Sequence, residues 1–242
     1  MHESVKIVIK DFSTHLNEVF KDDLTALVLY GSAAGNNYQS GISDINVLVI
    51  LEKSGAGKIF EFGKEAKSLI RKYRISPFIM TREEFASAAD VFPLEYCDIL
   101  DLNEVIIGPD SILNIKVNMG NLRTEVEGKL RGAISDICSM VLEAGGNEKT
   151  LADFLLSWSG IGTILFRGLL RLKKKAVSGI DTKAIISNVE KEYGVDLNSF
   201  TILNDPGKNK ILLMKGASKF AGTIIEPLKI LVRAVDAMDS AN

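Results

Sequence analysis

The sequence predicts two structural parts: a domain that mixes helices and strands over residues 1–114, and an all-helical bundle over residues 115–242. Two observations lead to this division. Before residue 114, short continuous apolar runs alternate with helical stripes, whereas after it the helical stripes continue and strand-like runs become rare. With 242 residues, the chain can bury a sizeable core either as one large domain or as two small ones.

Helices in the first part are predicted from apolar periodicity and from one capping signal. Residues 3–21 carry apolar side chains at mixed three- and four-residue spacings, as one face of a helix does: Val5, Val8, Ile9, Phe12, Leu16, Val19 and Phe20. Residues 58–73 show the same kind of stripe. Thr81 and Glu84 have the spacing of a capping box, which predicts that another helix begins there.

Strands in the first part are predicted from continuous apolar runs. Residues 24–30 and 45–51 are apolar without alternation, which is typical of strands buried on both faces. A third strand is expected over residues 75–80, where Pro77 restricts it to a sheet edge or a strand start. Residues 105–107 predict a last short strand, which the turn-forming Gly108 and Pro109 end.

The second part is predicted to be helical throughout. Residues 116–144 repeat apolar side chains at spacings of three and four, which indicates a long amphipathic helix. Further helices are expected over residues 150–176, 182–193 and 217–238. Pro227 predicts that the last of these begins or is kinked near that residue.

A chemically suggestive segment lies between the first two strands. It opens with Gly31 and Ser32, whose backbone N–H groups and hydroxyl are suited to hydrogen bonding with phosphate oxygens. Asp44 and Asn46 follow, and alternation along a strand places both on one face of the sheet. Magnesium in nucleotide-transferring sites is usually held by carboxylates together with substrate phosphate oxygens, so this spacing suggests a metal site.

These residues resemble the signature of the polymerase-beta-like nucleotidyltransferase superfamily. The chain reads Leu-Tyr-Gly-Ser ending at Ser32, then eleven residues, then Asp-Ile-Asn-Val-Leu-Val beginning at Asp44; the family has Asp-x-Asp at the latter place. Residues 92–99 and 105–110 resemble the closing elements of bacterial members. The second part resembles, in architecture, the helical domain of kanamycin and streptomycin adenylyltransferases. The resemblance implies an α+β fold, a nucleotidyltransferase-like mixed sheet with flanking helices, followed by an all-α helical-bundle domain.

Transferred residue by residue, the resemblance assigns Gly31 and Ser32 to the triphosphate and Asp44 to a magnesium ion. It also assigns Asn46 to the position of the second metal-binding carboxylate, and there the sequence departs from the family. An amide oxygen can bind magnesium, but it is neutral and cannot bridge two ions. The third carboxylate of the family is expected on the strand at residues 75–80, which contains no Asp or Glu. The acidic motif is therefore degenerate.

Two functions from different classes follow from this sequence. The first is a nucleotidyltransferase-family protein that binds a nucleoside triphosphate, with ATP favoured and with magnesium as its expected cofactor, whose transfer of a nucleoside monophosphate to an unknown acceptor is in doubt. The alternative is a catalytically inactive regulatory or protein-interaction module that retains the fold, a pseudoenzyme. Glu95, Asp98 and Asp101 share one helical face and could supply a base for an acceptor hydroxyl; a solvated acidic face is the other interpretation.

Composition argues against several classes of partner and location. The net charge of −2 provides no basic field for nucleic acid or an anionic membrane. The cysteines, Cys97 and Cys138, indicate neither a zinc site nor a disulfide framework and suit the cytoplasm. The longest apolar run, residues 154–166, falls short of the roughly 20 residues of a membrane-spanning helix. The apolar helix over residues 154–170 could be core or the surface of a homodimer.

Overall fold

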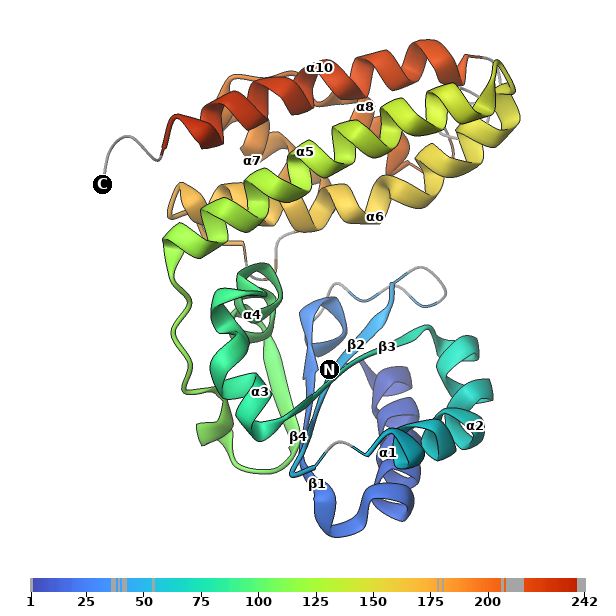
Figure 1. The fold of residues 1–242 in the computed structure, drawn as a ribbon, viewed down its shortest axis with the longest axis vertical. Coiled ribbons are helices and arrows are strands. Elements are labelled where there is room, and N and C mark those ends of the chain that lie inside the picture. The colour runs from blue at the N-terminus through green and yellow to red at the C-terminus, as the bar shows by residue number, and fades with distance from the viewer. Residues whose placement is uncertain are drawn as a thin grey trace. The chain divides into compact units, whose positions relative to one another are not determined.

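A computed structural model describes residues 2–35, 38, 40, 43–53, 55–177, 179, 181–205, 207 and 216–238, with residues 158–161 described by their backbone alone. The chain forms two compact units, Met1–Asn118 and Met119–Asn242 (Figure 1). That they are separately folding domains, with the predicted boundary near residue 114, stays a proposal.

The first unit is built on a mixed four-stranded sheet with the order β3-β2-β1-β4. Its strands are β1 (Leu24–Tyr30), β2 (Ile45–Leu51), β3 (Ile75–Thr81) and β4 (Asn103–Ile107). β1 pairs in antiparallel fashion with β2 and β4, whereas β2 and β3 are parallel. β3 is an edge strand, which is how the sheet accommodates Pro77. The mixed sheet predicted for this part is confirmed.

Two helices cover one face of this sheet, as Figure 1 shows: α1 (Glu3–Phe20) and α2 (Ala56–Tyr73). All seven residues of the stripe predicted for the first helix are buried. They form one apolar cluster with alternate residues of the strands, among them Leu27, Leu29, Val47 and Val49, and with Phe62 of α2. The hydrophobic effect thus fixes which face of β1 and β2 these helices cover.

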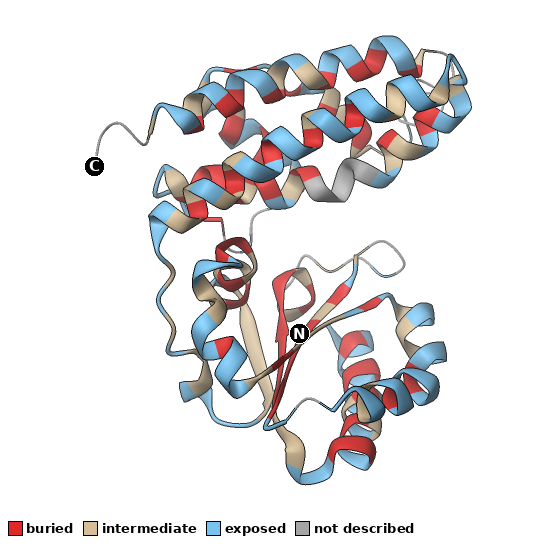
Figure 2. Ribbon diagram, viewed as in Figure 1, coloured by how far each residue is buried: buried red, intermediate tan, exposed pale blue. Residues whose placement is uncertain are grey.

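The opposite face is covered by α3 (Arg82–Ser87) and α4 (Pro93–Asp101). The other alternate residues of β1 and β2 lie here, in a cluster with Phe85 of α3 and Tyr96 of α4. The Tyr96 hydroxyl donates to the Phe85 carbonyl oxygen at 2.6 Å. α3 begins with the predicted capping box of Thr81 and Glu84. β1 and β2 are therefore buried from both sides, as their continuous apolar runs predicted (Figure 2).

The described part of the second unit is helical: α5 (Met119–Ala144), α6 (Glu148–Leu172), α7 (Thr182–Tyr193), α8 (Asn198–Leu203) and α10 (Ala217–Asp236). α5 packs against α6 and α10, and α6 also packs against α7 and α8. Each of the four predicted helices is present, while the short α8 was not predicted. α10 continues through Pro227, so a helix start at that residue is wrong. None of the described helices combines the length and apolar character needed to cross a membrane.

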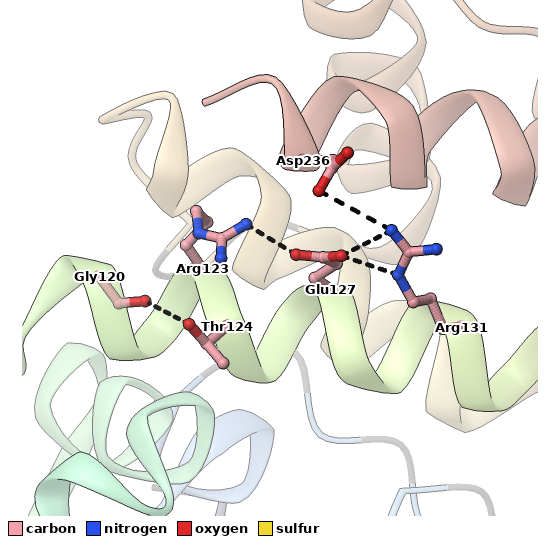
Figure 3. Close-up of polar contacts among 6 residues, drawn as sticks. All are labelled: Gly120, Arg123, Thr124, Glu127, Arg131 and Asp236. Atoms are coloured by element: carbon pink, nitrogen blue, oxygen red, sulfur yellow. Dashed lines mark hydrogen bonds and ion pairs between the residues drawn. The ribbon is translucent and has the colours of Figure 1, made fainter. Parts of the chain in front are cut away.

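A charged network joins α5 to α10 (Figure 3). The Glu127 carboxylate accepts hydrogen bonds from Arg131 Nε and from Arg123 Nη1, each at 2.7 Å. Arg131 Nη2 also lies 3.8 Å from Asp236 Oδ1 of α10. The hydrogen bond from Arg131, followed by that from Arg123, lowers the pKa of Glu127. At neutral pH Glu127 is therefore a carboxylate that fixes both arginines, one of which reaches the neighbouring helix.

Candidate functional site

The turn that follows β1 provides the first part of the site. Gly31 lies in the left-handed region with φ of +70°, and its N–H donates to the Leu102 carbonyl oxygen at 2.9 Å. Ser32 is half-buried in the short 3₁₀ turn Gly31–Ala34. Only glycine adopts such a φ readily, so this residue lets the chain turn directly at the strand end.

Strand β2 brings Asn46 to this turn. Tyr30 and Asn46 are partners in the antiparallel register of β1 and β2, so the residue after Tyr30 lies beside Asn46. A Cβ atom placed on Gly31 would be 3.4 Å from Asn46 Nδ2. The structure thus brings Gly31 and Asn46 together, with Ser32 next to Gly31 and Asp44 two residues before Asn46 in the sequence. The pairing of the end of β1 with the start of β2 is enough to produce this proximity.

Asp44 is engaged by a residue that the sequence analysis did not single out. Arg74 Nε lies 2.7 Å from Asp44 Oδ1, and both side chains are about half exposed, 53% for Arg74 and 50% for Asp44. The Ile45 N–H also donates to the Arg74 carbonyl oxygen at 3.0 Å. The carboxylate is therefore paired with a cation that the same chain supplies.

The donor set does not fit a magnesium pair. The residue of β3 in register with Asn46 is Ser76, a neutral hydroxyl, and residues 75–80, where the family resemblance places a third carboxylate, contain no Asp or Glu. Within the described residues, no group of three or more His, Cys, Asp or Glu side chains is arranged to hold a metal ion. Asp44 and Asn46 remain the predicted ligands, but they offer one carboxylate, already paired with Arg74, and one neutral amide.

The remaining acidic candidates lie elsewhere in this unit. Glu84 caps α3 at Thr81, and Thr81 is in register with Leu51 at the opposite end of β2 from Asp44. A seven-residue strand spans roughly 20 Å, which is too far for Glu84 to approach Asp44. The hydrogen bond from the Thr81 backbone lowers the pKa of Glu84. Glu84 is thus part of a helix cap and does not replace the missing carboxylates beside Asp44.

Glu95 of α4 is tied to β1. It accepts a hydrogen bond from the hydroxyl of Tyr30, the residue directly before Gly31. Burial, then the negative charge of Glu95, raises the pKa of the Tyr30 hydroxyl well above its usual range. Asp98 lies close enough to raise it further, whereas Asp101 is exposed. Glu95 and Asp98 therefore belong in part to the packing of β1 against α4.

Sequence reasoning missed two polar residues at this site, Tyr30 and Arg74. The apolar run over residues 24–30 includes Tyr30, but a strand-end tyrosine carries a hydroxyl that needs a partner when it is buried. Arg74 directly precedes the third predicted strand, as Asp44 directly precedes the second. The sequence thus places oppositely charged residues directly before two strands. This signal predicts an ion pair only once the two strands are known to be parallel neighbours.

Comparison with known proteins gives a likeness among solved structures. No family model matches the chain, and the search of curated proteins finds no similar sequence. Among solved structures, the chain is similar to the crystal structure of the spectinomycin adenyltransferase AAD(9) from Enterococcus faecialis with ATP and spectinomycin, with a TM-score of 0.53 and 12% identity. The match covers 96% of this chain and 99% of that one. The chain therefore has the fold of the aminoglycoside-type nucleotidyltransferases that its strand-end motif resembles.

Proposed function

We propose that this chain binds a nucleoside triphosphate at the ends of β1 and β2, with Gly31 and Ser32 next to the phosphates. The observation that carries the proposal is the register of β1 and β2, because it pairs Tyr30 with Asn46 and so sets the Gly31–Ser32 turn beside β2. Backbone N–H groups and a hydroxyl at such a turn are suitable phosphate donors. ATP is favoured because the similar adenyltransferase was crystallised with it.

We further propose that transfer of a nucleoside monophosphate is absent or very slow. Phosphoryl chemistry depends on placing and neutralising charge, and each 1.4 kcal/mol of lost transition-state stabilisation costs about tenfold in rate. Asn46 stands where a second carboxylate is expected, residues 75–80 carry no third one, and Asp44 is paired with Arg74. The same ion pair supports the second candidate function, a catalytically silent regulatory or interaction module, because it occupies the one remaining acid.

Calorimetric titration of the full chain with ATP, GTP, CTP and UTP, each with and without magnesium, tests the binding proposal. We expect saturable binding of at least one nucleotide. Ser32→Ala should weaken it at least tenfold, because a hydrogen bond to a charged group contributes about 1.5–3 kcal/mol. Ser111→Ala is a matched control, since Ser111 is the second residue of another short 3₁₀ turn, Asp110–Leu113, and is exposed.

The outcomes separate the two functions. Absence of heat for every nucleotide under both conditions would exclude nucleotide binding and leave the interaction module. Equal weakening by Ser32→Ala and Ser111→Ala would place the nucleotide elsewhere than at the Gly31–Ser32 turn. Pyrophosphate release in the presence of ATP and magnesium would contradict the proposed loss of transfer.

A further inference from the structure

We infer that the Arg74 guanidinium takes the place of a metal ion beside Asp44 and contacts the triphosphate directly, so that nucleotide binding by this chain does not need magnesium. The inference rests on the proposed function, because it requires a triphosphate at the Gly31–Ser32 turn. It adds a binding residue, Arg74, and a specific property of the site, which is independence from a divalent cation.

The position of Arg74 follows from the parallel pairing of β2 and β3. Ile45 and Ile75 are register partners. The residues before them, Asp44 and Arg74, therefore lie side by side where β2 and β3 begin. The hydrogen bond from the Ile45 N–H to the Arg74 carbonyl oxygen fixes this backbone arrangement. The 2.7 Å contact between Arg74 Nε and Asp44 Oδ1 then orients the guanidinium. The guanidinium is therefore held at the same end of the sheet as the proposed phosphate site.

The guanidinium retains donors for a ligand. It has five N–H groups in a rigid fork, of which the contact with Asp44 uses the one on Nε. Across the residues that the structure describes, none accepts a hydrogen bond from either Nη group of Arg74. Planar N–H pairs of this kind match phosphate oxygens in a bidentate geometry. Since Arg74 is about half exposed, these groups can be reached from solvent.

The backbone of Arg74 gives an independent indication. Arg74 is the C-terminal cap of α2 and lies in the left-handed region, with φ of 54° and ψ of 44°. Glycine is the favoured residue at such a cap, because a Cβ atom is strained there. The chain instead carries arginine at this position, and its side chain makes the contact with Asp44. The strain and the ion pair thus occur at the same residue.

A magnesium ion competes poorly at this place. It would have to displace Arg74 from Asp44, and the other protein oxygens in register would be the Asn46 amide and the Ser76 hydroxyl, both neutral. Magnesium prefers carboxylates and phosphate oxygens in near-octahedral geometry. Arg74 neutralises Asp44 without any such requirement and leaves its Nη hydrogen-bond donors for an anion.

The test compares ATP binding by the full chain in EDTA and in magnesium, using calorimetry. For the natural sequence we expect Kd values that agree within about threefold. The informative variant is Arg74→Gly, which removes the side chain and relieves the backbone strain, so it should fold at least as well in a thermal melt. It should bind ATP at least tenfold more weakly in EDTA, and added magnesium should partly restore its affinity because Asp44 is released.

Arg71→Ala provides the matched control, because Arg71 is exposed in the last turn of α2 and should leave both Kd values unchanged. Binding that requires magnesium in the natural sequence would overturn the inference while the proposed function stands. ATP binding in EDTA that Arg74→Gly does not weaken would overturn it as well. Failure of every nucleotide to bind in either buffer would instead remove the proposed function.

Discussion

Gly31 illustrates how one residue controls the geometry of the proposed site. Its φ of +70° is strained for any residue with a Cβ atom, although that atom would have room, with Asn46 Nδ2 at 3.4 Å. We therefore expect Gly31→Ala to lower the free energy of unfolding by about 1 kcal/mol through backbone strain alone. Urea denaturation followed by circular dichroism measures this change.

Gly63→Ala provides the matched comparison. Gly63 lies inside α2, is exposed, and a Cβ atom placed on it meets nothing within 4 Å. Alanine has a higher helix propensity than glycine, so this variant should be more stable by roughly 0.5–1 kcal/mol. The opposite signs of the two changes are the prediction. Stabilisation by both would show that Gly31 does not hold a left-handed conformation.

At the residue scale, the sequence allowed Gly31, Ser32, Asp44 and Asn46 to be identified as site candidates. Their spacing depends on local features, a turn between two apolar runs and alternation along a strand, which a linear sequence records. The partner of Asp44 could not be identified, because Arg74 lies 30 residues away and meets it only through the parallel pairing of β2 with β3. Interactions set by strand register leave no local pattern.

At the scale of an element, α10 shows how a helix tolerates an internal proline. Pro227 has no N–H, so the carbonyl oxygen of Thr223, four residues earlier, lacks its helical donor. The Ser199 hydroxyl of α8 lies 3.2 Å from that carbonyl oxygen and 2.8 Å from Thr223 Oγ1. The Thr223 hydroxyl itself donates to the Phe220 carbonyl oxygen at 2.7 Å. Because a hydroxyl has one hydrogen, Ser199 donates to one of these two oxygens at a time, and a hydrogen bond to the carbonyl oxygen would replace the one that Pro227 cannot donate.

A double-mutant cycle tests this compensation. Ser199→Ala should cost about 1 kcal/mol of stability in the natural sequence, because it removes the hydrogen bond that the Ser199 hydroxyl makes to Thr223. Pro227→Ala should stabilise α10 by about 1–3 kcal/mol and restore the helical N–H. In that background the cost of Ser199→Ala should fall by at least half, as measured by urea denaturation.

The control for this cycle is Ser187→Ala on α7, an exposed serine in a helix interior. Its effect should be small and equal in both backgrounds. An equal cost of Ser199→Ala with and without Pro227 would show that the hydroxyl serves Thr223 Oγ1 or the packing of α8 and has no link to the missing N–H. The coupling itself, and neither single change, carries the conclusion.

Elements differed in how well periodicity predicted them. The long helices α1, α2, α5 and α6 were found because each repeats its apolar side chains over several turns, which averages out single exceptions. α8 has six residues, fewer than two helical turns, and offers no periodicity to detect. Some observed helix ends differ from the predicted ones by a few residues. The reason is physical, because capping groups such as Asn147 at the start of α6 determine where a helix begins.

At the scale of the whole molecule, the order of the strands in the sheet could not be predicted from apolar patterns alone. The apolar runs identify β1 and β2, but nothing local distinguishes an antiparallel β1–β2 pair from a parallel one. The resemblance to a known family supplied the mixed sheet, and the fold likeness over 96% of the chain agrees with it. The boundary near residue 114 stays a prediction, which rests on the change from strand-like runs to helical stripes, and the first compact unit extends to Asn118.

The four residues between these two positions make the domain proposal testable. Ile115 and Val117 are partly buried against the apolar cluster that β1, β2, α3 and α4 share, so they belong to the packing of the first unit. A fragment of residues 1–118 should therefore unfold cooperatively in urea, with a slope of about 1–1.5 kcal/mol per molar. A fragment that stops at residue 114 should be less stable by about 2 kcal/mol, since it loses two half-buried apolar side chains. Far-UV circular dichroism at 222 nm follows both transitions. A broad transition in the longer fragment would show that the first unit depends on the helical one, and equal stability of the two fragments would place the boundary at residue 114.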